Sequence, residues 1–358
     1  MMYWIPFLAA EVLLLNEIKS TKMANCNKLF LDYNKSLEIS TEKKNRLKDS
    51  KETLRKRIKN YFKDNHPEYL PEFWIQGSYK MNTIILTKDD ECDLDYGVYF
   101  RRGIGVTGTT LQSWIWDAVD GATSTTPQHR KKCVRVIYKA DYHIDFPVYY
   151  FPEDEKHPCL AVKNEKLQKS DPKEVLEWFK KQKDDNGQFH RMVKNLKGWA
   201  DNIRNKMPSG LAMTILAAEN KNFDERDDVA LKNTLIEIQS TLEDNFECIV
   251  PATPNDDLFE NYDATRRKSF LDNLDGFIKD AKEAVDNESN QLKASKLWRK
   301  HLGDKFPLGA DEDVDAKESA LRSISQRILA GNAYTQRDGS ITDVATGVKN
   351  KPHHNYGG

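Results

Sequence analysis

The chain has 358 residues, of which 39% are hydrophobic and 31% are charged, and its formal net charge at pH 7 is -1. A chain of this length can bury a sizeable core and is expected to divide into two lobes or domains. The near-zero net charge excludes a general attraction to nucleic acid or to an anionic membrane, so we find no strong nucleic-acid signal. The five cysteines form no CxxC pair, which favours reduced thiols in a cytoplasmic protein.

The first fifteen residues are strongly apolar. They lack the basic start of a signal peptide, they include Glu11, and the run is short for a membrane span. We therefore predict that residues 1–23 are an apolar N-terminal extension, with Met23 near the natural start, and we expect no membrane association. A functional anchor and a packed N-terminal helix are the alternatives.

The next segment, residues 24–64, has the pattern of two helices. The second begins near Thr41 and carries apolar residues on one face and lysines and arginines on the other. This basic face is either solvated or available to a phosphate backbone. Pro67 and Pro71 end the helical region.

Residues 72–151 predict a small mixed sheet, because apolar strand-like runs alternate there with turns. After Pro172 the pattern predicts helices at about 173–183, 188–206, 209–220, 227–243, 266–286, 288–302 and 313–330. We find no convincing strand in this half. The expected fold is α+β and two-lobed: a catalytic lobe with N-terminal helices over 24–165, a helical lobe over 166–330 and a mobile tail over 331–358.

Three aspartates are the candidate catalytic residues. Asp93 and Asp95 lie two apart on one predicted strand and Asp145 lies on another, so each strand can present its carboxylates on the face opposite its apolar residues. Three carboxylates that converge repel one another unless cations intervene. Magnesium suits such a site because it takes oxygen ligands and keeps positions for substrate phosphates.

Gly77 and Ser78 follow the apolar run Phe73–Ile75 and supply a candidate phosphate-binding turn. Glycine lets the backbone approach a phosphate, and a helix starting at residue 78 would favour an anion at its N-terminus. Two Mg²⁺ (or Mn²⁺) ions on such a sheet suit displacement at phosphorus with release of pyrophosphate. Together these features predict a bound nucleoside triphosphate, ATP or another.

This arrangement resembles the nucleotidyltransferase superfamily, and within it the bacterial cGAS/DncV-like nucleotidyltransferases of anti-phage systems. The likeness rests on Gln76-Gly77-Ser78, the three aspartates, the segment HRMVKNLKGWAD before Pro208-Ser209-Gly210, the Pro-x-x-Pro-x-Asp-Asp-Leu stretch from Pro251 to Leu258, and LWRKHLGDKFP near residues 297–307. The family's fold implies a two-lobed nucleotidyltransferase with a small mixed β-sheet catalytic lobe and an α-helical C-terminal lobe.

The resemblance implies metal ligands at Asp93, Asp95 and Asp145. It also implies nucleotide contacts at Gln76, Gly77, Ser78, Lys197 and Ser209. Lys197 is otherwise a solvated lysine, and Ser209 is otherwise a helix N-cap. Arg135 is a candidate acceptor contact or a strand-face arginine paired with a carboxylate.

The resemblance also implies a role for the last residue of the chain. In such systems a ubiquitin-like transfer enzyme attaches the synthase to a target through its last residue, which makes Gly358 a candidate conjugation site. A frayed terminus is the alternative.

We therefore expect an enzyme that condenses nucleoside triphosphates into a cyclic di- or trinucleotide second messenger. One alternative is a linear nucleotidyltransferase acting on RNA or a small molecule. Another is an inactive nucleotide-binding or interaction module, against which the three aspartates argue.

Overall fold

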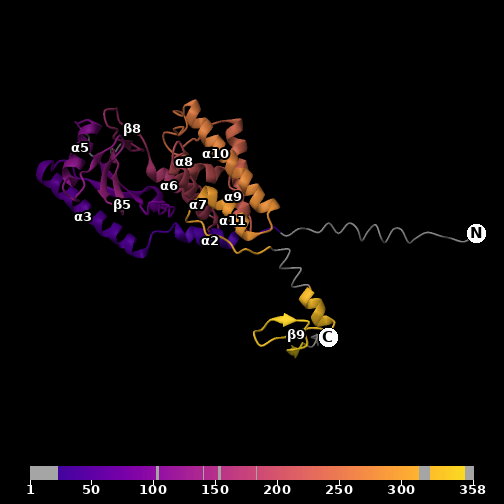
Figure 1. Ribbon diagram of the computed structural model, residues 1–358. Helices are drawn as coiled ribbons and strands as arrows, with labels where there is room; N and C mark the ends of the chain where they lie inside the picture. Colours follow the sequence, from indigo (N-terminus) through magenta and orange to yellow (C-terminus); the bar gives the residue numbers. More distant parts are fainter. Residues whose placement is uncertain are drawn as a thin grey trace, which may run out of the picture.

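The computed structural model describes residues 23–101, 105–139, 141–151, 155–182, 184–313 and 323–350. A half that contains the main sheet and a helical half lie side by side (Figure 1). Each has its own large cluster of buried apolar side chains, so the predicted two-lobed α+β fold is confirmed. The apolar extension predicted over residues 1–23 lies outside the described residues except for Met23.

The main sheet has one central strand that carries two of the predicted aspartates. This strand, β2, pairs with β1 in an antiparallel manner and with β5 and β6 in a parallel manner. The strands described in this sheet are β1 (Glu72–Gln76), β2 (Asp93–Phe100), β3 (Gln128–His129), β4 (Val134–Tyr138), β5 (Tyr142–Phe146), β6 (Val148–Tyr150), β7 (Cys159–Leu160) and β8 (Gln168–Lys169).

Two helices, α3 (Thr41–Asn65) and α5 (Gly108–Val119), cover the apolar face of this sheet. Leu94 and Val98 of β2 pack in the same buried cluster as residues of these helices. Because side chains alternate along a strand, Asp93 and Asp95 must then face the opposite side. The alternation of side chains along β2 thus places the candidate catalytic carboxylates on the face that α3 and α5 do not cover.

In the helical half, the other helices pack around α7. Its helices are α6 (Pro172–Lys180), α7 (Gln188–Ile203), α8 (Gly210–Glu219), α9 (Asp227–Asp244), α10 (Ala264–Lys282), the π-helix η1 (Glu283–Asn287) and α11 (Gln291–Leu302). The N-terminal helix α2 (Asn27–Ser36) packs with this half, since Phe30 contacts Trp298 and Phe306 edge to face. The domain boundary at residue 165 stays a prediction.

The end of the chain differs from the expectation in one respect. Residues 323–329 are helical, but they are followed by a small antiparallel sheet of β9 (Tyr334–Thr335), β10 (Ile341–Thr342) and β11 (Val348–Lys349). The prediction of no strand after Pro172 is therefore wrong, because strands of two residues are too short to leave an alternating pattern. The mobility of residues 331–358 stays a prediction, and Gly358 lies outside the described residues. Among the residues that the structure describes, no helix is both long and apolar enough to cross a membrane.

Candidate active site

The three predicted aspartates lie on adjacent strands. Asp95 of β2 is directly paired with Asp145 of β5, and Asp93 is paired with His143 in the same register. Partners in a parallel ladder present their side chains on the same face, so the carboxylates converge on the face away from α3 and α5. The structure therefore brings Asp93, Asp95 and Asp145 together as the strand pattern suggested.

Asp95 is the most perturbed of the three carboxylates. Burial, and then the charges of Asp145 and Asp93, raise its pKa from 3.8 to about 7. Among the described residues it has no hydrogen-bond donor and no ion-pair partner, whereas Asp145 accepts two hydrogen bonds from Arg135, each 2.7 Å long. Mg²⁺ prefers oxygen ligands, and three neighbouring carboxylates, one of them without a partner, supply such ligands. The residues present therefore fit the divalent metal ions that the sequence predicts.

The Gly77-Ser78 turn sits directly on Asp95. Gly77 begins the one-turn helix α4 (Gly77–Lys80) with φ at +62°. A Cβ at this position would lie 2.1 Å from Asp95 Oδ2. Glycine is required here for both its backbone conformation and its small size, and it places Ser78 beside the carboxylates.

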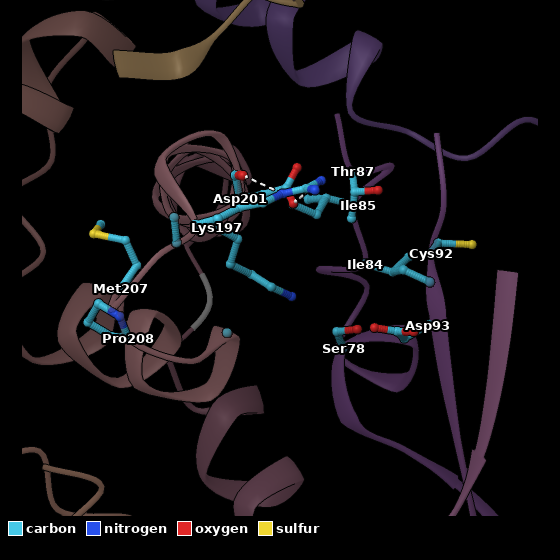
Figure 2. A pocket seen from close by; sticks show the side chains of 13 residues that line it. Ser78, Ile84, Ile85, Thr87, Cys92, Asp93, Lys197, Asp201, Met207 and Pro208 are labelled. Carbon is cyan, nitrogen blue, oxygen red and sulfur yellow. Dashed lines mark hydrogen bonds and ion pairs between the residues drawn. The ribbon is translucent and has the colours of Figure 1, made fainter. Parts of the chain in front are cut away.

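Lys197 of α7 forms the opposite wall. Its Nζ donates a 2.7 Å hydrogen bond to the backbone oxygen of Thr83, which connects the helical half to the sheet half. Burial lowers its pKa from 10.5 to about 8, and the charges of Asp95 and Asp93 partly oppose this shift. Ser78 and Asp93 lie on the sheet side and Lys197 on the facing helix (Figure 2). A half-buried cation thus faces the carboxylate cluster.

Two cavities meet at this point. One of about 500 Å³ is lined by all three aspartates, Gln76, Gly77, Ser78 and Lys197. The other, of about 380 Å³, shares Ser78, Asp93 and Lys197 with the first. The candidate site therefore opens onto two cavities, and Ser78, Asp93 and Lys197 line both of them.

Residues 71–149, which carry the three aspartates and the Gly-Ser turn, match the family model described as the nucleotidyltransferase domain of cyclic GMP-AMP synthase DncV-like proteins. In this segment the chain is similar to the cGAS/DncV-like nucleotidyltransferases. It is 29% identical over 190 residues to a cyclic GMP-AMP synthase of Escherichia albertii, a match that covers 48% of this chain and 42% of that enzyme. It is 25% identical over 345 residues to a cyclic AMP-AMP-AMP synthase of an Acinetobacter strain, covering 85% of this chain and 93% of that one.

Solved structures of Vibrio cholerae DncV share the fold. The apo form has a TM-score of 0.70 at 18% identity and covers 79% of this chain and 96% of its own. The complex with the linear intermediate 5' pppA(3',5')pG has a TM-score of 0.71 at 18% identity, with coverage of 81% and 100%. At this level of identity the likeness shows the two-lobed nucleotidyltransferase fold alone.

Ser209, for which the family resemblance implies a nucleotide contact, caps a helix in this structure. Its Oγ accepts a 3.2 Å hydrogen bond from the backbone N–H of Ala212 and so caps α8. The next residue, Gly210, lines both cavities. The cap is the alternative that the sequence left open, and a nucleotide contact by Ser209 stays a prediction.

Arg135 lies between two of the aspartates. Besides its two hydrogen bonds to Asp145, its Nη2 is 3.5 Å from Asp93 Oδ1. This is the carboxylate pairing that the sequence analysis left open as the alternative to an acceptor contact. An acceptor contact by Arg135 stays a prediction.

We expect Arg135→Gln to bind Mn²⁺ more tightly than the unmodified protein in the absence of nucleotide. The guanidinium neutralises the same carboxylates that would bind the ion, so its removal should lower the Kd for Mn²⁺ by about three- to tenfold. Isothermal titration calorimetry measures this. Arg130→Gln, which removes an arginine bonded to Gln128, is the matched control, and a weaker Mn²⁺ affinity in Arg135→Gln would contradict the prediction.

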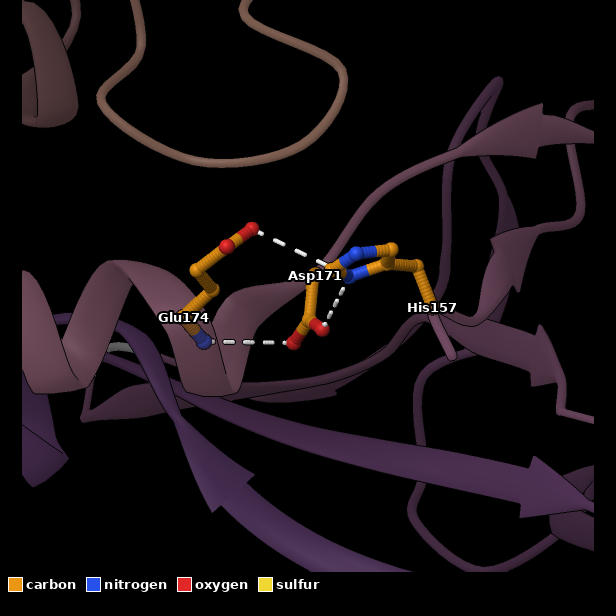
Figure 3. Close-up of side chains that lie close together, drawn as sticks. All are labelled: His157, Asp171 and Glu174. Carbon is orange, nitrogen blue, oxygen red and sulfur yellow. Dashed lines mark hydrogen bonds and ion pairs between the residues drawn. The ribbon is translucent and has the colours of Figure 1, made fainter. Parts of the chain in front are cut away.

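One wall of the larger cavity is held by a cluster at the edge of the sheet. His157 Nδ1 and Asp171 Oδ2 form a 3.0 Å hydrogen bond, and Glu174 lies beside them (Figure 3). Glu174 Oε2 accepts a 2.7 Å hydrogen bond from the backbone N–H of Thr253. Asp171 also caps α6. These contacts fix the loop around Thr253, which lines the cavity together with Asp171.

Sequence reasoning missed several residues of this cavity. Asp171 comes from a loop whose position in space has no local pattern. Thr253 and Asp256 lie in the Pro251–Leu258 stretch, which the sequence marked as a family resemblance without assigning it to the site. Tyr149 also lines the cavity, and it did have a signal, because Asp145, Pro147 and Tyr149 alternate on one face of β5 and β6. The strand rule that located Asp145 would have located Tyr149.

Proposed function

We propose that this protein condenses nucleoside triphosphates into a cyclic oligonucleotide second messenger and releases pyrophosphate at each step. The observation that carries the proposal is the convergence of three carboxylates, the Gly77-Ser78 turn and Lys197 on one cavity of about 500 Å³. Two relatives are themselves cyclic nucleotide synthases, for cyclic GMP-AMP and cyclic AMP-AMP-AMP. Their names support this class of product and leave the bases joined by this chain to experiment.

The roles of the residues follow from their positions. Asp93, Asp95 and Asp145 would hold two Mg²⁺ (or Mn²⁺) ions, whose charge activates an attacking hydroxyl and neutralises the leaving pyrophosphate. Ser78 and the backbone of the Gly77 turn would bind the triphosphate beside the carboxylates. Lys197, held by Thr83, would place a positive charge against the same phosphates from the opposite wall.

Product analysis tests the proposal. Purified protein is incubated with the four labelled nucleoside triphosphates, singly and in pairs, with Mg²⁺ or Mn²⁺, and the products are treated with phosphatase and analysed by mass spectrometry. We expect a phosphatase-resistant cyclic product that disappears with EDTA. Linear products alone would favour a linear nucleotidyltransferase, and no product under any condition would favour a binding module.

The cellular setting is part of the same proposal. A second-messenger synthase of this family would act in the cytoplasm in an anti-phage pathway, and a ubiquitin-like transfer enzyme would join Gly358 to a target. Mass spectrometry of the chain expressed with its neighbouring genes checks the last point. Recovery of unmodified Gly358 in every species would contradict it.

A further inference from the structure

The side chain of Gln76 is held from within the sheet. Gln76 is the last residue of β1 and immediately precedes Gly77. Its Nε2 donates a 3.0 Å hydrogen bond to Tyr149 Oη, and its Oε1 accepts a 3.0 Å hydrogen bond from Tyr99 Oη. The amide is therefore oriented by two tyrosines and not left free to turn.

The two tyrosines form a rigid platform. Tyr99 and Tyr149 are paired in register between β2 and β6, and their rings stack with centroids 4.6 Å apart and planes at 10°. Each is only 3% exposed. Burial raises the pKa of both phenols, so both stay protonated and uncharged in neutral solution and remain able to donate hydrogen bonds.

This network joins the three chain segments that build the candidate site. Tyr99 lies four residues after Asp95 on β2, and Tyr149 lies four residues after Asp145, so strand alternation puts both rings on the face of the carboxylates. Gln76 is paired directly with Asp95. Close approach of its amide is possible because residue 97 is glycine: a Cβ there would lie 2.5 Å from Gln76 Oε1.

We propose that Tyr99, Gln76 and Tyr149 are positioning residues that fix the Gly77-Ser78 turn relative to Asp95 and Asp145. Gln76 then acts on the triphosphate through the turn that follows it, not as a direct ligand. The inference rests on the proposed nucleotidyl transfer at this site. Its physical basis is that a small misplacement of a binding group raises the barrier of a reaction that depends on alignment.

Two other roles of the network give different results in experiment. If Gln76 contacts the triphosphate directly, Gln76→Met should cost far more catalysis than the loss of either tyrosine hydroxyl. If the tyrosines only fill the core, loss of a hydroxyl should change stability and leave catalysis unaltered. The three roles therefore differ in which variants affect turnover.

The test uses single and combined substitutions in the full chain. The variants are Gln76→Met, Tyr99→Phe, Tyr149→Phe and the double variant Gln76→Met/Tyr149→Phe. The control is Tyr150→Phe, since Tyr150 is the next residue of β6, its ring points to the other face of the strand, and no hydrogen bond of its hydroxyl is found among the described residues. We measure kcat and KM for triphosphate turnover, the Kd of a non-hydrolysable triphosphate analogue with Mg²⁺, and the Tm.

We expect each tyrosine variant to lower kcat/KM by about three- to tenfold, the range that loss of one hydrogen bond predicts. Gln76→Met should lower kcat/KM by at least as much. The double variant should have the same kcat/KM as Gln76→Met alone, because both substitutions break the same hydrogen-bond network. Tyr150→Phe should match the unmodified protein in all three measurements. The Kd of the analogue should rise in the same order as the loss of kcat/KM.

Three results would overturn the inference. They are a defect confined to Gln76→Met, a lower Tm in the tyrosine variants with unchanged kcat, KM and Kd, and fully additive losses in the double variant. If the unmodified protein forms no nucleotide product, the proposed function fails by itself. The Kd series then decides the positioning role separately, since it needs binding of the analogue and no turnover.

Discussion

Asp95→Asn is expected to abolish product formation and at the same time to stabilise the metal-free protein. Activity should fall by at least about 1,000-fold, because loss of a metal-binding carboxylate removes several kcal/mol of transition-state stabilisation. The gain in stability has a separate cause. The carboxyl has a pKa of about 7 in the folded protein and 3.8 as its ordinary value, so its ionisation opposes folding.

The sign of this effect depends on pH. The folded state binds the proton more tightly than the unfolded state, so the cost of ionising Asp95 grows as pH rises from about 4 and is fully present above about 7. At pH 8 without metal, Asp95→Asn should therefore raise the free energy of unfolding by about 1–3 kcal/mol and the Tm by a few degrees. The gain should shrink toward pH 5.

Thermal unfolding in EDTA at pH 5 and pH 8, together with the product assay, measures both effects. Asp64→Asn is the matched control, since it makes the same chemical change at an exposed position near the end of α3. It should alter neither activity nor Tm. A lower Tm for Asp95→Asn at pH 8, or product formation at the level of the unmodified protein, would count against the assigned environment and role.

Lys197→Met should lower kcat/KM by about 100-fold, which corresponds to about 2.7 kcal/mol of transition-state stabilisation. Methionine keeps the buried apolar stem of the lysine and removes the charge that faces Asp93 and Asp95 across the cavity. It also removes the hydrogen bond to Thr83 that connects the two halves. The triphosphate then loses its cation on the helical wall.

The pH profile provides a second readout for the same residue. Burial lowers the pKa of Lys197 to about 8, so the unmodified enzyme should lose kcat/KM as pH rises through about 8 and the amine gives up its proton. Since kcat/KM reports the ionisation of free enzyme, this alkaline limb should be absent in Lys197→Met.

Lys194→Met is the control for this pair of measurements. Lys194 lies one turn earlier on α7, where its Nζ is 3.5 Å from Glu38. It should keep the rate and retain an alkaline limb, which should move slightly to higher pH because the charge of Lys194 also lowers the pKa of Lys197. A limb that persists unchanged in Lys197→Met would assign the titration to another group.

The sequence was most informative where the chemistry lies on regular strands. Asp93 and Asp95 share a face because strand side chains alternate, and the apolar run around Asp145 predicted a second strand of the same kind. The positions of the helices after Pro172 also followed from local patterns, with ends that differ by a few residues from α6 to α11. These features depend on neighbours along the chain.

Other features depend on parts of the chain that meet only in the folded protein. The packing of α2 against Trp298 and Phe306 and the position of Thr253 in the cavity wall are examples. No local pattern reports such contacts. The strands of two residues after residue 333 were missed for the opposite reason, because they are too short for any periodicity.

The sequence by itself therefore predicted the two-lobed class from chain length and from the change of strand pattern to helix pattern. It also predicted that Asp93 and Asp95 share a strand face and that Gly77 makes a turn, because side chains alternate along a strand and glycine is conformationally free. Only the tertiary structure decided how these groups are held. It pairs Arg135 with Asp145, leaves Asp95 without a partner among the described residues, bonds Lys197 to the backbone of Thr83 and orients Gln76 by Tyr99 and Tyr149. Charge pairing and burial depend on distances between residues far apart in the chain, and folding alone fixes those distances.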